Sequence, residues 1–320
     1  MKQILRNSTD PYFNIAAEEY ILKNYKEDII MFWQSSPSVI VGKHQNTISE
    51  VNMNFANQHN IPVIRRITGG GTVYHDEGNI NYSIITSSEN QEKLVDFKRF
   101  TEPIIGFLDS LGLKAVFEGK NNLCINNKKF SGNSAHVFKN KVLHHGTILF
   151  NTNLDYLEAS IYKSSFSISD KSVKSIRANV ANIADELSIP LLFEEFKDKL
   201  TKYFNDYFNT EDTIQLSDND INSINKLVTE KYKLWDWNFG YSPSYNYSNI
   251  IDGITISMRI EKGVIVSISI DSELDKKDSV CDKLINCQFK QEVIEEVLKE
   301  VDINKPHFNI YMSLFGINKL

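Results

Sequence analysis

An alternating stretch that begins at Asn79 limits the folds open to this chain. Residues 79–84 read Asn-Ile-Asn-Tyr-Ser-Ile, which places Ile80, Tyr82 and Ile84 on one face of a strand and three polar side chains on the other. This period of two predicts a strand, and Gly69–Gly71, three consecutive glycines, precede it in the sequence. Any fold must therefore bury one face of this strand and accommodate a glycine loop before it.

The elements around this strand indicate a mixed α+β fold. Asp10-Pro11 is typical of a helix start, with aspartate as the N-cap and proline in the first turn. Residues 29–34 and 38–43 are strand-like, residues 91–111 read as an amphipathic helix, and several strands are expected between Lys114 and Asn151. Strands in hairpins with helices interspersed favour mixed or antiparallel sheets with packed helices over a doubly wound parallel sheet.

A change of pattern near residue 245 indicates two domains. Residues 235–249, "WDWNFGYSPSYNYSN", are aromatic and rich in turn formers, so we expect a linker or docking segment there rather than a regular element. Beyond them, residues 253–270 predict a β-hairpin that turns at Glu261-Lys262-Gly263, and two helical patterns follow. We therefore predict a larger domain over 1–244 and a small α+β domain over 245–320.

Composition excludes several classes of protein. The net charge of −6 over 320 residues argues against sequence-independent binding of nucleic acid, which needs a basic surface. No apolar run approaches the length that spans a bilayer, and the N-terminus lacks the apolar core of a secretory signal. The cysteines, Cys124, Cys281 and Cys287, form no metal-type or disulfide framework, so we expect a reducing, cytoplasmic setting.

The glycine loop is the first candidate site. In "RRITGGGTVYHDEGN" (65–79), Gly69–Gly71 indicate positive φ or a close approach to the backbone, and free N–H groups there can bind an anion. Arg66 would add a planar cation suited to carboxylate or phosphate. The spacing matches neither GxxxxGK[ST] nor GxGxxG. From these residues alone, an anion site and a plain glycine turn both stay open.

Histidines and a lysine supply further candidates. His75 is followed by Asp76, but neighbouring strand residues face opposite ways, so we interpret His75 as structural rather than as a metal ligand. Lys129, in "KKFSGNSAH" (128–136), is either a solvated surface charge or, if it points into a pocket, a point charge on a developing anion. Ser131 would share its face if the strand continues. His145, in "HHGTILF" (144–150), is either a core histidine or a catalytic one.

Taken together and in this order, these stretches resemble the motifs of lipoate–protein ligases. "DPYFNIAAEEY" is similar to the family's N-terminal helix, "RRITGGGTVYHDEGN" to its signature loop, and "GKNNL", "KKFSGNSAH" and "HHGTILFN" to the motifs that follow. "SIRANVANI" (175–183) and "WDWNFGYSP" (235–243) extend the resemblance. It implies a catalytic domain like that of biotin protein ligases and a smaller accessory domain.

The resemblance also implies a two-step reaction. ATP and lipoate would give lipoyl-AMP and pyrophosphate, and the lipoyl group would pass to a lysine of an acceptor protein. Expected acceptors are the lipoyl domain of the acyltransferase subunit of 2-oxoacid dehydrogenase complexes and the glycine-cleavage H protein. Mg²⁺ is expected on the phosphates, although no carboxylate cage is visible in the sequence.

Carried over residue by residue, the resemblance places Lys129 at the catalytic position, in contact with the carbonyl and phosphate of the adenylate. Arg66 and the backbone of Gly69–Gly71 would line the acyl-adenylate site, and Asn121 matches an asparagine near the nucleotide. His75 and His145 match motif positions and are expected to bind substrate or adenylate, without a specific chemical role. Besides Gly70 within the loop, the remaining positions expected to bind substrate or adenylate are Thr68, Asn79, Ser131, Gly132, Gly146 and Thr147.

One departure and three alternatives accompany this expectation. The family usually has Arg-Asn-Asp where this chain has Lys120-Asn121-Asn122, and the lost carboxylate puts the details of Mg²⁺ binding in doubt. A carrier-dependent lipoyl or octanoyl acyltransferase needs an activated cysteine, but none lies between Lys129 and Val280, and Cys124 falls on an expected buried strand. A biotin ligase ranks lower because the segment "WDWNFG" is more similar to lipoate ligases than to biotin ligases. A non-catalytic lipoate or adenylate binder is favoured only by Asn122.

Overall fold

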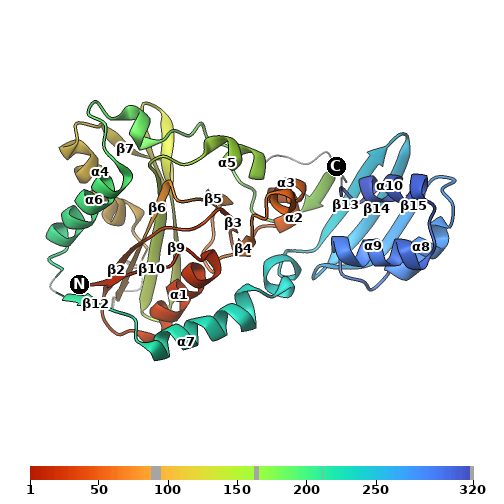
Figure 1. Cartoon of the computed structure of the whole chain (residues 1–320), viewed down its shortest axis with the longest axis horizontal. Helices are drawn as coiled ribbons and strands as arrows, with labels where there is room; N and C mark the ends of the chain where they lie inside the picture. The colour runs from red at the N-terminus through yellow and green to blue at the C-terminus, as the bar shows by residue number, and fades with distance from the viewer. Residues whose placement is uncertain (88–94, 162–165, 211, 318–320) are drawn as a thin grey trace. The chain divides into compact units, whose positions relative to one another are not determined.

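The computed structural model describes residues 1–87, 95–161, 166–210 and 212–317 (Figure 1). The chain forms two compact units. The larger unit comprises Met1–Lys43, Ile61–Ala159 and Ser175–Lys233, and the smaller unit comprises His44–Asn60, Ser160–Lys174 and Leu234–Leu320. Both units are assembled from several chain segments, and separate domains over 1–244 and 245–320 stay a prediction. Among the described residues, no helix combines the length and apolarity that crossing a membrane requires.

The larger unit is built on a mixed sheet of eight strands. Its parallel part is β12–β1–β2, and the remaining neighbours are antiparallel. This arrangement confirms the predicted mixed α+β class. In spatial order the strands are β12 (Asp212–Ile214), β1 (Lys2–Leu5), β2 (Ile29–Trp33), β6 (Asn79–Ser87), β10 (Lys141–Leu149), β9 (Lys128–Phe138), β8 (Asn122–Ile125) and β7 (Ala115–Glu118).

A second, three-stranded sheet carries the glycine loop. Its order is β4 (Val63–Arg65), β3 (Ser38–Val41) and β5 (Val73–His75), with β3 parallel to β4 and antiparallel to β5. The loop runs from the end of β4 to the start of β5. Because β3 belongs to this sheet, it does not pair with β2, although the two strand-like runs are neighbours in sequence.

Helices cover the two faces of the main sheet differently (Figure 1). On one face, α4 (Phe97–Ser110) and α6 (Phe193–Tyr207) pack on the apolar side of β6 and form the main core. On the other lies α1 (Pro11–Asn24), which starts as predicted, because the Asp10 side chain accepts a hydrogen bond from Tyr12 N at 2.8 Å. The other helical elements of this unit are α5 (Leu154–Ser160), α7 (Asp218–Leu227), η2 (Ile183–Glu186) and the π-helical turn η3 (Val228–Tyr232).

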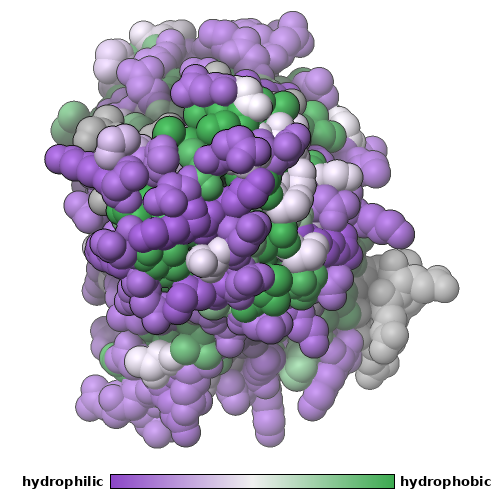
Figure 2. Space-filling view, turned by 90° about the vertical axis from the view of Figure 1, so that its right-hand side faces the viewer, coloured by the Kyte–Doolittle hydropathy of each residue, from purple (hydrophilic) through white to green (hydrophobic). Residues whose placement is uncertain are grey.

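The smaller unit has its own sheet, core and helices. Its antiparallel strands, in spatial order, are β11 (Ser167–Asp170), β13 (Tyr245–Ile251), β14 (Ile254–Glu261) and β15 (Val264–Asp271). Its helical elements are α2 (Thr47–Glu50), α3 (Met53–Gln58), η4 (Asp236–Gly240), α8 (Lys277–Leu284), α9 (Gln291–Glu300) and α10 (Lys305–Leu314). Hydrophilic side chains cover most of the face seen in Figure 2, with small apolar areas between them.

Two expectations for the C-terminal region are corrected and one is confirmed. Residues 235–249 are not irregular, because they contain the π-helical turn η4 and most of β13. Three described helices, rather than two, follow the hairpin. The hairpin itself turns where predicted, with Lys262 and Gly263 at φ +50° and +75°. The Trp235 ring lies against Gly263, where a Cβ would collide with it.

Candidate active site

The glycine loop is held in shape by hydrogen bonds to its carbonyl groups. Gly69 O accepts bonds from Arg66 Nη2 at 2.6 Å and Ser134 Oγ at 2.9 Å, and Gly71 O accepts a second bond from Arg66 Nη2 at 2.7 Å. Only Gly70 needs a positive φ, at +85°, and a Cβ there would lie 3.1 Å from Arg66 Nη2. A Cβ added at Gly69 would meet no atom within 4 Å. The three glycines therefore meet different constraints.

This geometry leaves the loop's N–H groups available to a ligand. In a trans peptide the C=O and the following N–H point in opposite directions, so binding of Gly69 O by Arg66 turns the N–H of Gly70 away from the guanidinium. Across the described part of the chain, the N–H groups of Gly69, Gly70 and Gly71 have no hydrogen-bond partner, whereas Thr72 N donates to Ser175 Oγ at 3.0 Å. Three unpaired N–H groups in succession form a concavity of the kind that binds anions.

Arg66 lies beneath the loop as its organiser. It is 5% exposed, and Nε donates to Thr68 Oγ1 at 2.8 Å while Nη1 donates to Ile40 O at 3.0 Å. Together with the two bonds from Nη2, this commits four of the five N–H groups of the guanidinium. Burial lowers the pKa of Arg66 to about 10, so the side chain is still a cation at neutral pH. Arg66 contributes a positive charge behind the loop, and its direct contact with a ligand stays a prediction.

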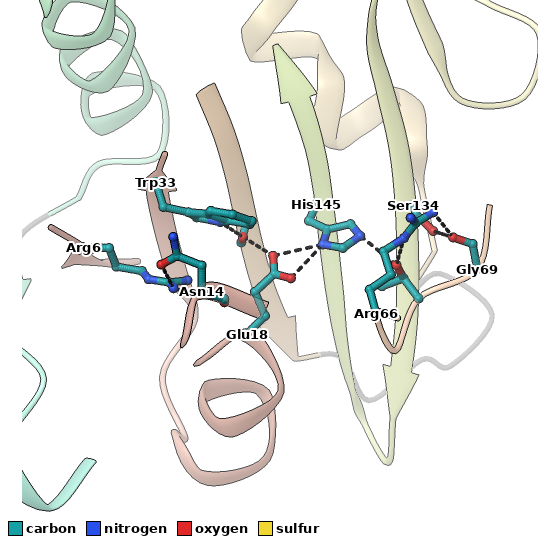
Figure 3. A network of polar contacts seen from close by, with 10 residues as sticks. Arg6, Asn14, Glu18, Trp33, Arg66, Gly69, Ser134 and His145 are labelled. Atoms are coloured by element: carbon teal, nitrogen blue, oxygen red, sulfur yellow. Dashed lines mark hydrogen bonds and ion pairs between the residues drawn. The ribbon is translucent and has the colours of Figure 1, made fainter. Parts of the chain in front are cut away.

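A buried hydrogen-bonded network connects the loop to α1 (Figure 3). Thr68 Oγ1 lies 2.8 Å from His145 Nε2, and His145 Nδ1 lies 2.9 and 3.0 Å from the two carboxylate oxygens of Glu18. Ser83 Oγ donates to Glu18 at 2.6 Å and accepts from Trp33 Nε1 at 3.0 Å. His145 is therefore a buried histidine, as one of the two interpretations held, but every polar atom of its ring is engaged in a chain that leads to the site.

Glu18 is ionised in this network. Burial raises the pKa of its carboxyl group, but the charge and hydrogen bond of His145, the hydrogen bond of Ser83 and the charge of Arg6 together bring it below the ordinary value. An ionised carboxylate only accepts hydrogen bonds. The direction of each bond around it is therefore fixed.

Next to this network lies a group of buried polar atoms without partners. Both ring nitrogens of His75, both amide atoms of Asn79 and Nδ2 of Asn81 have no hydrogen-bond partner among residues 1–87, 95–161, 166–210 and 212–317. All three side chains are buried. Burial, with added repulsion from Arg66 and His145, lowers the pKa of His75 to about 3, so the imidazole is neutral. Buried polar groups in folded proteins are normally paired, so these atoms offer hydrogen bonds that a ligand or ordered water can complete.

Lys129 is an unpaired cation on β9. Its side chain is partly buried, and within the described residues no carboxylate forms an ion pair with Nζ. Burial, with repulsion from Arg66, lowers the pKa of this amine. A Cβ at residue 132 would stand 3.0 Å from Nζ, so the lysine side chain lies directly over Gly132. Of the two interpretations of Lys129, a partly buried point charge fits these contacts better than a solvated surface lysine.

The expectation that Ser131 shares the face of Lys129 is wrong. The ladder between β8 and β9 shifts register beside Lys129, so the simple alternation of side chains is interrupted there. Lys129 Nζ approaches Gly132, whereas Ser131 Oγ lies 3.4 Å from Asn133 Nδ2, and Asn133 in turn accepts a bond from Tyr82. Ser131 therefore belongs to the face that packs on the helices, and its assignment to the adenylate site stays a prediction.

The other predicted positions have clear structural surroundings. Asn121 Nδ2 donates to Asn133 O, and Asn133 N donates to Asn121 O at 3.0 Å, which closes the turn at the start of β8. Gly146 lies under Tyr82 and Asn133, whose side chains leave no room for a Cβ. Thr147 is partly buried on β10 and faces Asn81 of β6 in register. Their roles toward a nucleotide stay predictions.

Sequence reasoning missed Glu18, Ser134 and Ser175. The available signal for Glu18 was the pair of adjacent glutamates in "NIAAEEY", an otherwise apolar stretch of helix. Both glutamates are buried, which is rare for this residue type unless each is paired. Ser134 and Ser175 carry no such signal, because serines in strands and loops are common.

The cysteines and acidic residues limit the chemistry. Cys124 is buried on β8, and burial together with Glu118 raises the pKa of its thiol to about 11, so it is not an activated nucleophile. Nowhere in the described ranges do three or more His, Cys, Asp or Glu side chains gather in a way that could hold a metal ion.

Two family models cover most of the chain. The family described as "Lipoyl protein ligase A/B catalytic domain" matches residues 10–205, and "Bacterial lipoate protein ligase C-terminus" matches residues 243–315. Lipoate–protein ligase 1 of Staphylococcus aureus is 40% identical over 314 residues, covering 95% of each chain.

Solved structures share the fold. Lipoate–protein ligase A bound with ATP is 25% identical with a TM-score of 0.65, over 75% of this chain and 98% of that chain. A bipartite lipoate protein ligase from Thermoplasma acidophilum, described together with its E2 lipoyl domain, is 24% identical with a TM-score of 0.65, over 75% and 96%.

Proposed function

This chain belongs to the lipoate–protein ligase family, and on that premise we propose that it activates lipoate with ATP and transfers the lipoyl group to a lysine of an acceptor protein. The observation that carries the proposal is the glycine loop, whose carbonyl groups are bound from below by Arg66 and Ser134 while its N–H groups are unpaired. With the unpaired Lys129, this provides both dipoles and a cation for an anionic intermediate.

In the first step, the lipoate carboxylate attacks the α-phosphorus of ATP. An O–P bond forms, the bond to the β-phosphate breaks, and pyrophosphate leaves with the electron pair. Two anions must approach each other, so positive charge and oriented N–H groups lower the barrier. Lys129 Nζ and the N–H groups of Gly69–Gly71 would act on the phosphate and acyl oxygens, and the buried cation of Arg66 would add its field from behind.

In the second step, the ε-amine of an acceptor lysine attacks the acyl carbonyl of lipoyl-AMP. A C–N bond forms, the C–O bond to phosphate breaks, AMP leaves, and the amine loses a proton. Negative charge develops on the carbonyl oxygen, where Lys129 would stabilise it as a point charge. Lys129 would thus serve both steps without becoming covalently modified.

The group of unpaired polar atoms supports a polar contact with the bound substrate. His75, Asn79 and Asn81 offer neutral donors and acceptors inside the unit, and covering them with hydrocarbon alone would leave them unsatisfied. We therefore propose that these side chains meet polar atoms of the adenylate or ordered water around it.

We place Mg²⁺ on the phosphates of the nucleotide. This ion commonly binds substrate phosphates while retaining several waters, and no group of three or more His, Cys, Asp or Glu side chains that could hold a metal ion lies among the described residues. When bound, it would neutralise phosphate charge. The proposed acceptors are lipoyl domains of 2-oxoacid dehydrogenase acyltransferase subunits and the glycine-cleavage H protein, a class consistent with the lipoyl domain paired with the Thermoplasma relative.

Pyrophosphate release tests the proposal. Purified protein is mixed with ATP, Mg²⁺ and lipoate, and an added lipoyl domain is weighed by mass spectrometry. Lys128→Ala is the matched control for Lys129→Ala, because Lys128 is a neighbouring lysine that pairs with Glu186 at 3.5 Å. Release that depends on Lys129 but not Lys128, with a lipoyl mass gain on the acceptor, supports the ligase. Modification of the acceptor only from an acylated carrier protein would overturn it.

A further inference from the structure

Two adjacent glutamates on α1 have separate surroundings. Glu18 and Glu19 are 1% and 3% exposed. Glu19 bonds to Lys23, to Lys231 at 2.7 Å and to Tyr232 at 2.5 Å, which attaches the end of the larger unit to α1. Glu18 instead faces the main sheet and binds His145 and Ser83. Neighbouring residues of a helix lie about 100° apart around its axis, so the two carboxylates contact different parts of the fold.

The carboxylate of Glu18 determines which tautomer the neutral His145 ring adopts. Glu18 only accepts, so His145 Nδ1 donates to it, and in the neutral ring Nε2 is then an acceptor. In this form of the ring, the hydroxyl of Thr68, 2.8 Å away, donates to Nε2. This leaves the lone pairs of Thr68 Oγ1 to accept from Arg66 Nε at 2.8 Å.

Arg66 transmits this arrangement to the glycine loop. With Nε held by Thr68 and Nη1 held by Ile40 O, the planar guanidinium has one orientation. In that orientation Nη2 reaches both carbonyl groups of the loop, at 2.6 and 2.7 Å. The path from Glu18 to the loop thus runs through Arg66, which donates on one side to Thr68 and on the other to the loop carbonyl groups.

We propose that Glu18 is a positioning residue for adenylate formation, acting through the Nδ1–H tautomer of His145, Thr68 and Arg66 on the glycine loop. The inference rests on the proposed function, because the loop's ligand is the adenylate. The proposal states that the carboxylate of Glu18 on α1 determines whether the N–H groups of Gly69–Gly71 are oriented to bind the adenylate. Glu18 is not required to touch substrate for this role.

Glutamine at residue 18 keeps the size of the side chain but removes the charge and adds two N–H donors. The reason to expect an effect is that a donor facing His145 Nδ1 favours the opposite tautomer, in which Nε2 donates to Thr68. The Thr68 hydroxyl then loses its acceptor and receives two donors at once. Arg66 is no longer held in one orientation, and the loop carbonyl groups are released.

The first readout uses ligand-free protein. Nitrogen-15 NMR of the imidazoles, with His145→Gln to assign the signal, reports the tautomer directly. We expect the neutral ring to carry its proton on Nδ1 in the natural chain and to shift toward Nε2–H in Glu18→Gln, with changed amide chemical shifts at Gly69–Gly71 in that variant. An unchanged His145 tautomer with unchanged amide shifts at the loop would overturn the proposal, whether or not the protein proves to be a ligase.

The second readout is lipoate-dependent pyrophosphate release. Glu18→Gln and Thr68→Val are each expected to lower kcat/KM for ATP by about ten- to hundredfold, the range for leaving one buried hydrogen-bonding group unpaired. Thr68→Ser, which keeps the hydroxyl, should recover most of the loss seen with valine. Glu19→Gln is the matched control, expected to lower the melting temperature but to keep kcat/KM for ATP per folded molecule.

These variants separate the possible failures. If Glu18→Gln does not fold, Thr68→Val tests the same path from the loop side. Equal losses in Glu18→Gln and Glu19→Gln would indicate a general effect of disturbing α1 and contradict the positioning role. If the natural chain releases no pyrophosphate, the proposed function fails, while the NMR measurements still decide whether Glu18 controls the loop.

Discussion

The two faces of the main sheet are made by alternate residues of the same strands, yet they differ in how completely their polar groups are satisfied. On β6, Ile80, Tyr82 and Ile84 enter the core under α4 and α6, and even the Tyr82 hydroxyl has a partner in Asn133. On the opposite face, Asn79 and Asn81 carry buried amide atoms without partners in the described residues. One face is packed and paired, whereas the other holds buried polar groups whose lack of partners costs stability.

The difference between the two faces indicates that the functional side chains of the main sheet lie on the face with buried polar groups. Apolar packing accounts for Ile80, Tyr82 and Ile84 on one face. On the other face, a satisfied network beginning at Glu18 and an unsatisfied group around His75 lie next to each other. The predictions that follow probe each face in turn.

The largest expected effect is on stability, from the apolar face. Phe196 of α6 is fully buried and lies 4.5 Å from Phe150 and 5.2 Å from Phe107 between ring centroids. Phe196→Ala should lower the free energy of unfolding by about 3–5 kcal/mol, because it leaves a cavity in the core. Urea unfolding measures this loss, with the exposed Lys199→Ala on the same helix as control. Activity per folded molecule should not change, and a large fall in it would show that the two faces are not independent.

Lys129→Ala should lower activity and leave stability nearly unchanged, the opposite of the result expected for Phe196→Ala. Without the point charge, pyrophosphate release should fall by about 10²–10³-fold, the range for removing one preorganised electrostatic group. Because Nζ has no ion-pair partner among the described residues, little folding energy is lost. Parallel activity and unfolding measurements on Lys129→Ala and Lys128→Ala check this, and equal activity in both variants would refute the assignment.

The unsatisfied group around His75 should appear in the pH dependence of stability. With its folded pKa lowered to about 3, His75 binds a proton below pH 6.5 only in the unfolded chain. Its contribution to stability is therefore present above pH 6.5 and is lost as the pH falls toward 3. Between pH 7 and 5 the natural chain should lose about 2 kcal/mol more than His75→Phe. Urea unfolding of both at each pH measures it, and parallel losses would contradict a neutral, buried His75.

The smallest expected effect is that of Cys124→Ser on activity. The thiol is buried, and its pKa is raised to about 11, so it is not the nucleophile of an acyl transfer. Lipoylation of the acceptor per folded molecule should be unchanged. Complete loss of transfer in a variant that still folds would favour the thioester mechanism of the acyltransferases.

Local patterns in the sequence predicted much of the fold. The alternation at residues 79–84, the start of α1 at Asp10-Pro11 and the hairpin turn at 261–263 are all confirmed, because each depends on neighbouring residues only. The helix expected over 91–111 begins at Phe97 among the described residues, and residues 88–94 lie outside them. The irregular segment expected at 235–249 is wrong, because its aromatic residues form a π-helical turn and a strand through tertiary packing.

The site shows why sequence reasoning stops where it does. The glycine loop and Lys129 could be identified from their motifs, whereas the shared face of Lys129 and Ser131 failed because the register shift depends on pairing with β8. Glu18 was missed because its partner His145 is 127 residues away along the chain. The roles of the individual residues toward lipoate and ATP stay predictions.

Gly69 and Gly70 are expected to tolerate substitution for different reasons and to different extents. Gly70 combines a φ of +85° with a neighbouring guanidinium, so the fold itself resists other residues there. Gly69 has an ordinary φ and open space where a Cβ would stand, so nothing in the described structure requires a glycine. Among chains that share this fold, we therefore expect glycine at residue 70 wherever the loop keeps its conformation. At residue 69 we expect glycine only where the bound ligand needs the space of the missing Cβ.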